Sequence, residues 1–218
     1  MARTRKKSRS DGAAGESGPR GSGRPTERKA ILVLGAHRSG TSALTRALSL
    51  CGARLPENLM GATEINPRGF FESQPIYLLH ERILAELGSS WHDLAPLSPA
   101  WLDSELARTL VQEMATLVEE EFGDAPLFVL KDPRISRLIP FWLRALDVLA
   151  IAPVFVLPVR NPLEVADSLS QAESIERQRG LLIWLNSVLH AEYGSREFPR
   201  SVISYDTCLL YTSDAADE

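Results

Sequence analysis

Short runs of apolar residues alternate with longer amphipathic stretches along most of this chain. Four runs have the length and content of strands buried on both faces: 31–35, 127–131, 154–159 and 201–205. Apolar residues at every third or fourth position predict helices between them, at roughly 41–51, 74–88, 103–122, 135–149, 162–172 and 175–194. We therefore expect a single α/β domain over 30–207, with three layers: a central parallel sheet flanked by helices.

The first apolar run leads into a turn bounded by two glycines. The run stops at Gly35, and Gly40 directly precedes the first expected helix. This geometry points backbone N–H groups and the positive end of a helix dipole at one spot, which predicts a phosphate site. The spacing matches Gly-x-x-x-x-Gly-Lys-Ser/Thr, except that Thr41 replaces the lysine and a cation, Arg38, stands inside the loop. The missing lysine argues against an ordinary ATPase or GTPase.

The loop sequence His-Arg-Ser-Gly-Thr-Ser over 37–42 resembles the 5′-phosphosulfate loop of sulfotransferases that use 3′-phosphoadenosine 5′-phosphosulfate (PAPS). The form with arginine before Ser-Gly-Thr is typical of bacterial and Golgi-type members. The resemblance implies a P-loop-like fold, PAPS as co-substrate, no metal, and a catalytic role for Arg38. It also implies that the donor is bound by His37, Arg38, Ser39, Gly40, Thr41 and Ser42.

A second strand end carries another phosphate-binding pattern. Arg160 follows the run 154–159, Pro162 begins the next helix, and Ser168 comes eight residues after the arginine. An arginine at a strand end with such a serine resembles the family's 3′-phosphate motif, and a guanidinium with a hydroxyl can bind a phosphate monoester. Taken alone, Arg160 would be a surface ion-pair residue and Ser168 a solvated helix residue.

The third strand end is Lys131-Asp-Pro-Arg134. Lys131 is expected at the carboxyl edge of the sheet, where ligands of open α/β sheets bind. In related sulfotransferases a lysine in this context lies near the transferred sulfuryl group, and the resemblance implies that catalytic role for Lys131. Asp132 and Arg134 can equally form a local ion pair that caps the next helix.

The segment 64–72 resembles the Asn-Pro-Lys/Arg-Gly-aromatic-aromatic-Glu signature of many bacterial members. Sulfuryl transfer to a hydroxyl needs a base, and a carboxylate in a cleft can serve. Glu72 is the first candidate, with Glu64 and Glu57 behind it. The alternative is that Glu72 caps the helix that begins near Gln74.

Composition fits one globular domain. The chain has 218 residues, of which 44% are hydrophobic and 24% charged. No apolar run approaches the roughly 20 residues that span a bilayer, and the polar stretch 3–29 lacks the apolar region of a signal peptide. Because Golgi sulfotransferases carry a membrane anchor, we expect a cytoplasmic enzyme of the bacterial type. Histidine and cysteine spacing indicates no metal site, and Cys51 is expected in the core.

The two ends of the chain differ from the middle. Residues 1–29 carry nine Lys/Arg and three Asp/Glu, a net charge of +6, so the other 189 residues total −4 − 6 = −10. We expect a disordered basic tail over 1–29, and the acidic remainder argues against nucleic-acid binding. The last eleven residues, 208–218, resemble the translation of a sequencing-library adapter. We therefore expect a non-native tail after a domain that is incomplete at its carboxyl end.

Together these patterns predict a PAPS-dependent sulfotransferase that acts on a hydroxyl of a carbohydrate or another small acceptor. Trp91, in the loop between 88 and 96, is a candidate for the acceptor-side wall or a simple loop anchor. One alternative is a P-loop nucleotide kinase or related phosphotransferase, and another is a non-catalytic protein with a degenerate sulfotransferase fold. The sequence names neither the acceptor nor the oligomeric state.

Overall fold

A four-stranded parallel sheet forms the centre of the computed structural model, which describes residues 27–63 and 69–206. The strands lie in the order β2-β1-β3-β4, and every neighbouring pair is parallel. Their bounds are β1 Lys29–Val33, β2 Leu127–Lys131, β3 Ala152–Val159 and β4 Arg200–Ser204. Because all strands run in the same direction, their carboxyl ends share one edge of the sheet.

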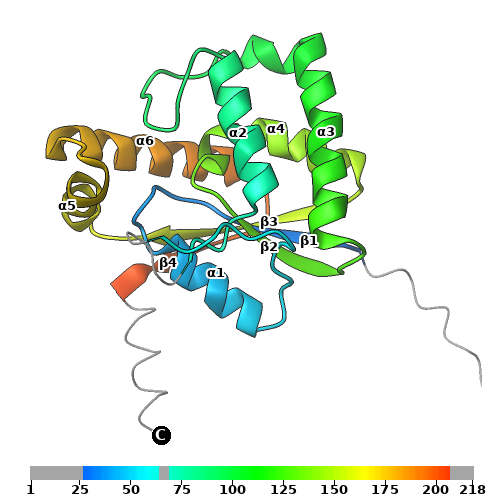
Figure 1. Cartoon of the computed structure of the whole chain (residues 1–218), viewed down its shortest axis with the longest axis horizontal. Helices are drawn as coiled ribbons and strands as arrows, with labels where there is room; N and C mark the ends of the chain where they lie inside the picture. The colour runs from blue at the N-terminus through cyan, green and yellow to red at the C-terminus, as the bar shows by residue number, and fades with distance from the viewer. Residues whose placement is uncertain (1–26, 64–68, 207–218) are drawn as a thin grey trace, which may run out of the picture.

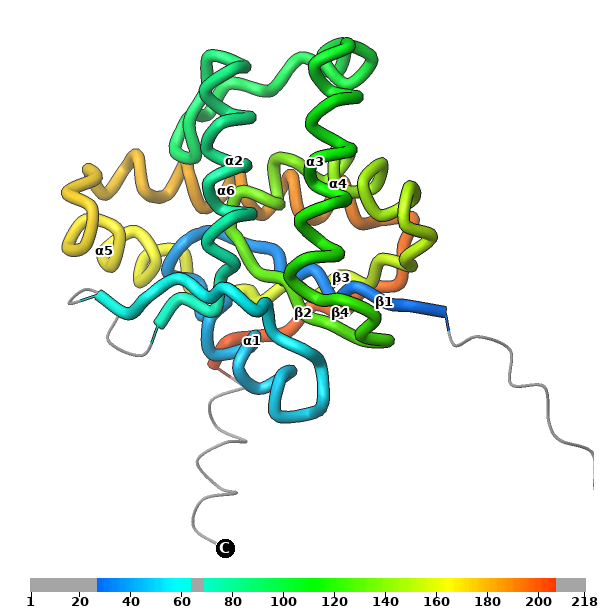
Figure 2. Tube along the Cα trace, turned by 45° about the vertical axis from the view of Figure 1, so that its right-hand side comes forward, coloured from blue at the N-terminus to red at the C-terminus, as the bar shows by residue number. Residues whose placement is uncertain are grey.

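Helices cover both faces of the sheet, which confirms the predicted α/β class. In Figures 1 and 2, α1 lies on one face, while α2, α3, α4 and α6 lie on the other. The helices are α1 Thr41–Leu50, α2 Gln74–Glu86, α3 Glu105–Phe122, α4 Ile135–Val148, α5 Pro162–Glu173 and α6 Arg177–Ser195. In the described part of the chain, no helix is long and apolar enough to cross a membrane.

Successive side chains of each strand point to opposite faces of the sheet, so the apolar core forms two clusters, one on each face. Leu32 and Leu130 are fully buried in the larger cluster, which includes Trp142 of α4. Val33 and Val129 point the other way, into a smaller cluster with Leu44 of α1. Successive side chains of a strand face opposite sides of a sheet, so continuous apolar runs are needed where helices pack on both sides.

The element boundaries differ from the prediction in small ways. β1 begins at Lys29, a residue that the sequence placed in the basic tail, and β3 begins at Ala152. A short 3₁₀ helix, η1 Pro99–Asp103, was not predicted. Cys51 is the C-cap of α1 and is exposed, so the prediction of a core cysteine is wrong. The residue lies beyond the last helical position, in the turn that contains Gly52.

Several predictions lie outside the described residues. They are the tail over 1–26, Glu64 with the Asn-Pro-Arg part of its motif, and the segment 208–218.

Candidate functional site

The turn between β1 and α1 has the backbone geometry of an anion site. Gly35 has a φ of 129°, and its N–H donates to Ser136 Oγ at 3.0 Å, so α4 fixes the start of the turn. Gly40 is the N-cap of α1, with a φ of 84° and no side-chain cap. The Ser39 hydroxyl is 1% exposed and has no partner among the described residues. Uncapped N–H groups beside a buried free hydroxyl can both donate to an oxyanion.

The two predicted phosphate-binding motifs are in direct contact. Arg38 Nε donates to Ser168 Oγ at 2.9 Å, and Arg160 donates to the Arg38 carbonyl at 3.1 Å. Arg38 itself has a φ of 66°, a left-handed backbone that a non-glycine residue adopts at a cost. These contacts hold the loop of β1–α1 against α5 at the carboxyl edge of the sheet.

Arg160 also forms a surface ion pair, which was the alternative that the sequence left open for this residue. Its guanidinium pairs with Glu164 one turn along α5 at 2.9 Å and lies over the Tyr205 ring, 4.8 Å from the centroid. Tyr205 in turn rests on the backbone of Gly40, where an added Cβ would overlap the ring. Arg160 is therefore oriented from two sides, by a carboxylate and by an aromatic face.

Lys131 and Glu72, both predicted to be catalytic, form a buried ion pair with each other. Burial raises the pKa of Glu72 above its ordinary value, and the Lys131 charge opposes that shift. The Phe70 carbonyl accepts from Lys131 Nζ at 3.3 Å and from the Ser42 hydroxyl at 3.2 Å. The described part of the segment 64–72 thus lies against the first turn of α1, which follows the β1–α1 turn. The cap of α2 is Ser73, not Glu72.

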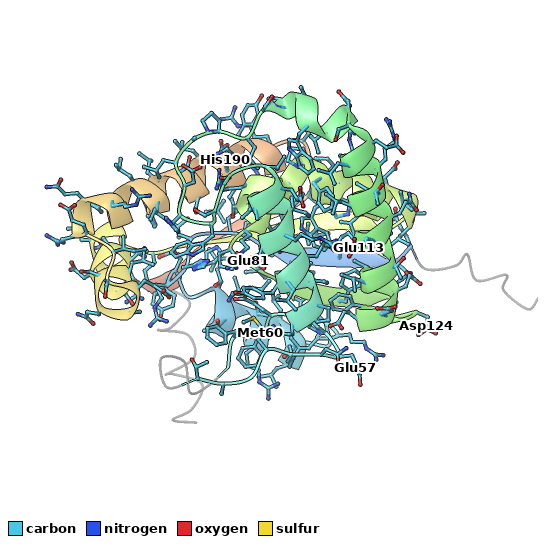
Figure 3. The ribbon with its side chains drawn as sticks, turned by 45° about the horizontal axis from the view of Figure 1, so that its top comes forward. Glu57, Met60, Glu81, Glu113, Asp124 and His190 are labelled. Atoms are coloured by element: carbon cyan, nitrogen blue, oxygen red, sulfur yellow. The ribbon has the colours of Figure 1, made fainter. Side chains whose placement is uncertain are left out.

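Glu57, the other described candidate for the base, lies elsewhere. Its side chain is exposed and pairs with Arg54 at 3.3 Å. Figure 3 places Glu57 near Asp124, beyond the end of α3. This position makes Glu57 a surface residue and leaves Glu72 as the described candidate.

A buried polar network beneath the site holds the Lys-Asp-Pro-Arg segment. Asp132 accepts from the Arg134 guanidinium at 3.0 Å and from His80 Nδ1 at 2.8 Å. Burial would raise the pKa of Asp132, but the charge of Arg134 and the contact with His80 lower it well below its usual range. Arg134 also donates to Glu81, labelled on α2 in Figure 3. The predicted local ion pair of Asp132 and Arg134 is therefore present, but α4 has no side-chain cap at its N-cap residue, Arg134.

The sequence analysis missed His80 as part of this network. The Trp142 indole N–H donates to His80 Nε2 at 2.9 Å, so Nδ1 carries the proton that is donated to Asp132. His80 lies on the apolar face of α2 with Ile76 and Ile83. A histidine within an apolar stripe is a signal that could have indicated a buried polar partner.

His37 lies flat against Trp91, with the two rings 4.2 Å apart and 5° from parallel. Its Nε2 is buried and has no hydrogen-bond partner in the described part of the chain. Burial lowers the pKa of His37 to about 3. The charges of Arg134, Lys131 and Arg38 add to the shift, and Asp132 opposes it. The imidazole is therefore neutral at physiological pH.

Trp91 belongs to a loop that Arg137 of α4 holds in place. The Arg137 guanidinium donates to the carbonyls of Ser90 and Ala95, the latter at 2.8 Å, and to Ser89 Oγ at 3.2 Å. Asp93 closes the loop by accepting from Ser89 and from the Ala95 N–H. Trp91 adds an anchor of its own, since it packs against the apolar clusters on this side of the sheet and stacks on His37 of the β1–α1 turn.

Comparison with known families finds no family model that matches this chain, and no curated protein matches it. Any functional assignment therefore depends on the chemistry of the site. Within 27–63 and 69–206, no group of three His, Cys, Asp or Glu side chains could hold a metal ion. The site instead gathers Arg38, Lys131 and Arg160 with uncapped backbone N–H groups, a combination suited to a polyanionic ligand.

Proposed function

We propose that this protein is a PAPS-dependent sulfotransferase that transfers a sulfuryl group to a hydroxyl of a carbohydrate or another small acceptor. The observation that carries the proposal is the contact of Arg38 with both Ser168 and Arg160. This contact supports the proposal because it joins the turn expected to bind the 5′-phosphate to the residues expected to bind the 3′-phosphate. A ligand with phosphate at both ends of its ribose fits such a pair of sites.

In this scheme the chain's residues bind and orient the donor. Backbone N–H groups of 39–42, with His37 and the Ser39, Thr41 and Ser42 side chains, surround the 5′-phosphate. Arg160 and Ser168 bind the 3′-phosphate, for which Arg160 exchanges its contact with Glu164. Arg38 and Lys131 stabilise the negative charge that develops on the bridging oxygen as the sulfur–oxygen bond breaks.

Glu72 is the proposed base. The acceptor oxygen attacks sulfur in line with the leaving phosphate, and Glu72 takes the hydroxyl proton. A raised pKa suits a carboxylate for this task, since the proton is better retained once it has been taken. Protonation of Glu72 also releases Lys131 from its counter-charge, so the lysine can move to the departing phosphate oxygen.

In this proposal the acceptor binds on the side of Trp91. Trp91 stacks on His37 through one face of its indole, and the other face can pack against the C–H face of a sugar ring or against a planar acceptor. We place the enzyme in the cytoplasm as part of the same proposal. The scheme uses side-chain cations for charge neutralisation and assigns no step to a metal.

Ligand-induced thermal stabilisation of the full chain tests the donor site. Adenosine 3′,5′-bisphosphate (PAP), the product of the donor, should raise the melting temperature without magnesium, whereas ATP with magnesium should not. Arg160→Gln should remove most of the PAP shift, while Arg54→Gln, on the exposed surface, should keep it. Stabilisation by ATP and magnesium but not by PAP would indicate a nucleotide phosphotransferase instead. Transfer of labelled sulfate from PAPS to a panel of hydroxyl acceptors then identifies the acceptor.

A further inference from the structure

His37 has an unusual combination of surroundings. It is an ionisable group inside the phosphate loop, one of its nitrogens is buried without a hydrogen bond among the described residues, and its ring is held flat on Trp91. A buried polar atom without a partner is costly in a folded protein, so each such atom calls for an explanation. In the described part of the chain, no group supplies that partner.

Charged groups face the imidazole from two elements. Arg38 comes from its own loop, and the junction of β2 and α4 supplies Lys131, Asp132 and Arg134. On the side of the Trp91 loop, the His92 ring contacts Trp91 edge-on, and Arg179 of α6 donates to the His92 carbonyl at 3.4 Å. Three cations and one carboxylate therefore surround His37, and Asp132 is already engaged by Arg134 and His80.

We propose that His37 is a specificity-determining residue that stays neutral in the free site and becomes a cationic partner of the donor once a polyanion lies among the surrounding cations. The inference rests on the proposed donor site. It adds that ligand binding is coupled to the uptake of one proton by the His37 imidazole.

The physical reason is charge balance. In the free site, burial and the three neighbouring cations disfavour a protonated imidazole. The three cations and the Asp132 carboxylate sum to 3 − 1 = +2. A ligand with two phosphate groups brings about −3 to −4, so the repulsion becomes a net attraction. The buried imidazole nitrogen could then donate a hydrogen bond. A singly phosphorylated nucleotide supplies less charge and would recruit the proton less well.

Thermodynamic linkage gives the expected size. If the bound complex returns His37 to an ordinary pKa of about 6.5, proton uptake strengthens binding about fourfold at pH 6.0 and hardly at all at pH 8.0. Because the bound-state pKa is the higher one, this contribution grows as pH falls. The phosphates of the ligand titrate in the same range, so the measured quantity is the difference between wild type and a variant without the imidazole.

Calorimetric titration of the full chain with PAP at pH 6.0 and pH 8.0 provides that comparison. His37→Gln should bind PAP about fourfold more weakly than wild type at pH 6.0 and equally well at pH 8.0. With adenosine 5′-monophosphate the difference at pH 6.0 should shrink. His190→Gln is the matched control, because His190 on α6 also has a pKa lowered by burial and by Arg137 (Figure 3).

Imidazole NMR resonances report the proton directly. The signal that disappears in His37→Gln should not titrate between pH 5 and 8 in the free protein, and should titrate there with saturating PAP. A signal that stays independent of pH in the complex, or an affinity loss equal at both pH values, would overturn the inference while leaving the donor site intact. Failure of PAP to bind at either pH would instead overturn the proposed function.

Discussion

Arg38 and Ser168 are 130 residues apart in the chain, and a hydrogen bond of 2.9 Å joins them at the edge of the sheet. The strand order explains this proximity. β1 and β3 are parallel neighbours, so the loop that follows β1 and the helix that follows β3 begin side by side. The two predicted phosphate motifs therefore lie in direct contact.

Ser168→Ala should weaken binding of ligands that carry a 3′-phosphate. Loss of one hydrogen bond to a charged phosphate costs about 1.5 kcal/mol or more, or at least about tenfold in affinity for PAP. Binding of adenosine 5′-phosphosulfate, which lacks the 3′-phosphate, should not change. Ser170→Ala, an exposed serine on the same helix, is the control for the titrations. Equal losses for both ligands would place Ser168 elsewhere than at the 3′-phosphate.

Gly40→Ala should destabilise the protein more than Gly88→Ala does. Both glycines have positive φ, so an alanine costs about 1 kcal/mol at either position. Only at Gly40 would the new Cβ overlap the Tyr205 ring, whereas nothing lies within 4 Å at Gly88. Urea unfolding of the two variants measures the difference. Equal losses of stability would show that the Tyr205 ring moves aside without lowering the free energy of unfolding.

The ion pair of Lys131 and Glu72 is buried, so removal of one partner alone should destabilise the protein strongly. Lys131→Met alone leaves the Glu72 carboxylate without its counter-charge and should cost about 3–5 kcal/mol of unfolding free energy. The double variant with Glu72→Leu should recover part of this loss. The exposed pair of Arg54 and Glu57 provides the comparison, with an expected coupling of at most about 1 kcal/mol. A double variant that is less stable than Lys131→Met would contradict this description.

Asp132 should govern part of the acid denaturation. Its pKa is lower in the folded protein than in the unfolded chain, so its contribution to stability is complete above about pH 4 and is lost as the pH falls further. Asp132→Asn should therefore lower stability at pH 7 and flatten its dependence on pH below about 4. Melting temperatures between pH 2.5 and 7 test this, and Asp147→Asn on the exposed side of α4 controls for the change in net charge. If the melting temperature of Asp132→Asn fell with pH as steeply as that of the wild type, other carboxyl groups would be responsible for the acid denaturation.

Arg137→Met should loosen the loop that carries Trp91. The substitution keeps much of the side-chain volume but removes the donors to two loop carbonyls and a hydroxyl. Hydrogen exchange of the amides in 88–96 should become faster while that of β1 and β3 stays slow. Arg144→Met, at an exposed position of the same helix that contacts η1, is the matched control. Unchanged exchange in 88–96 would show that the loop is held by its own internal hydrogen bonds.

The sequence by itself located most secondary-structure elements and the chemistry at the strand ends. Its expectation for β2 matches the observed strand at both ends, and α1, α4 and α5 begin where expected. These features depend on local properties, namely apolar runs, helical periodicity, glycine turns and proline at a helix start. Arg38, Lys131 and Arg160 could be selected for the same reason, because Lys131 and Arg160 stand at the carboxyl ends of strands and Arg38 stands in the glycine-bounded turn after β1.

Only the tertiary structure decided which side chains meet. Nothing local in the sequence pairs Glu72 with Lys131, His37 with Trp91, or His80 with Asp132. These partners come from different elements, and their contacts depend on strand order and on how α2 and the loop after it pack over the sheet. Periodicity reports the environment of one element at a time, whereas a contact between two elements depends on the positions of both.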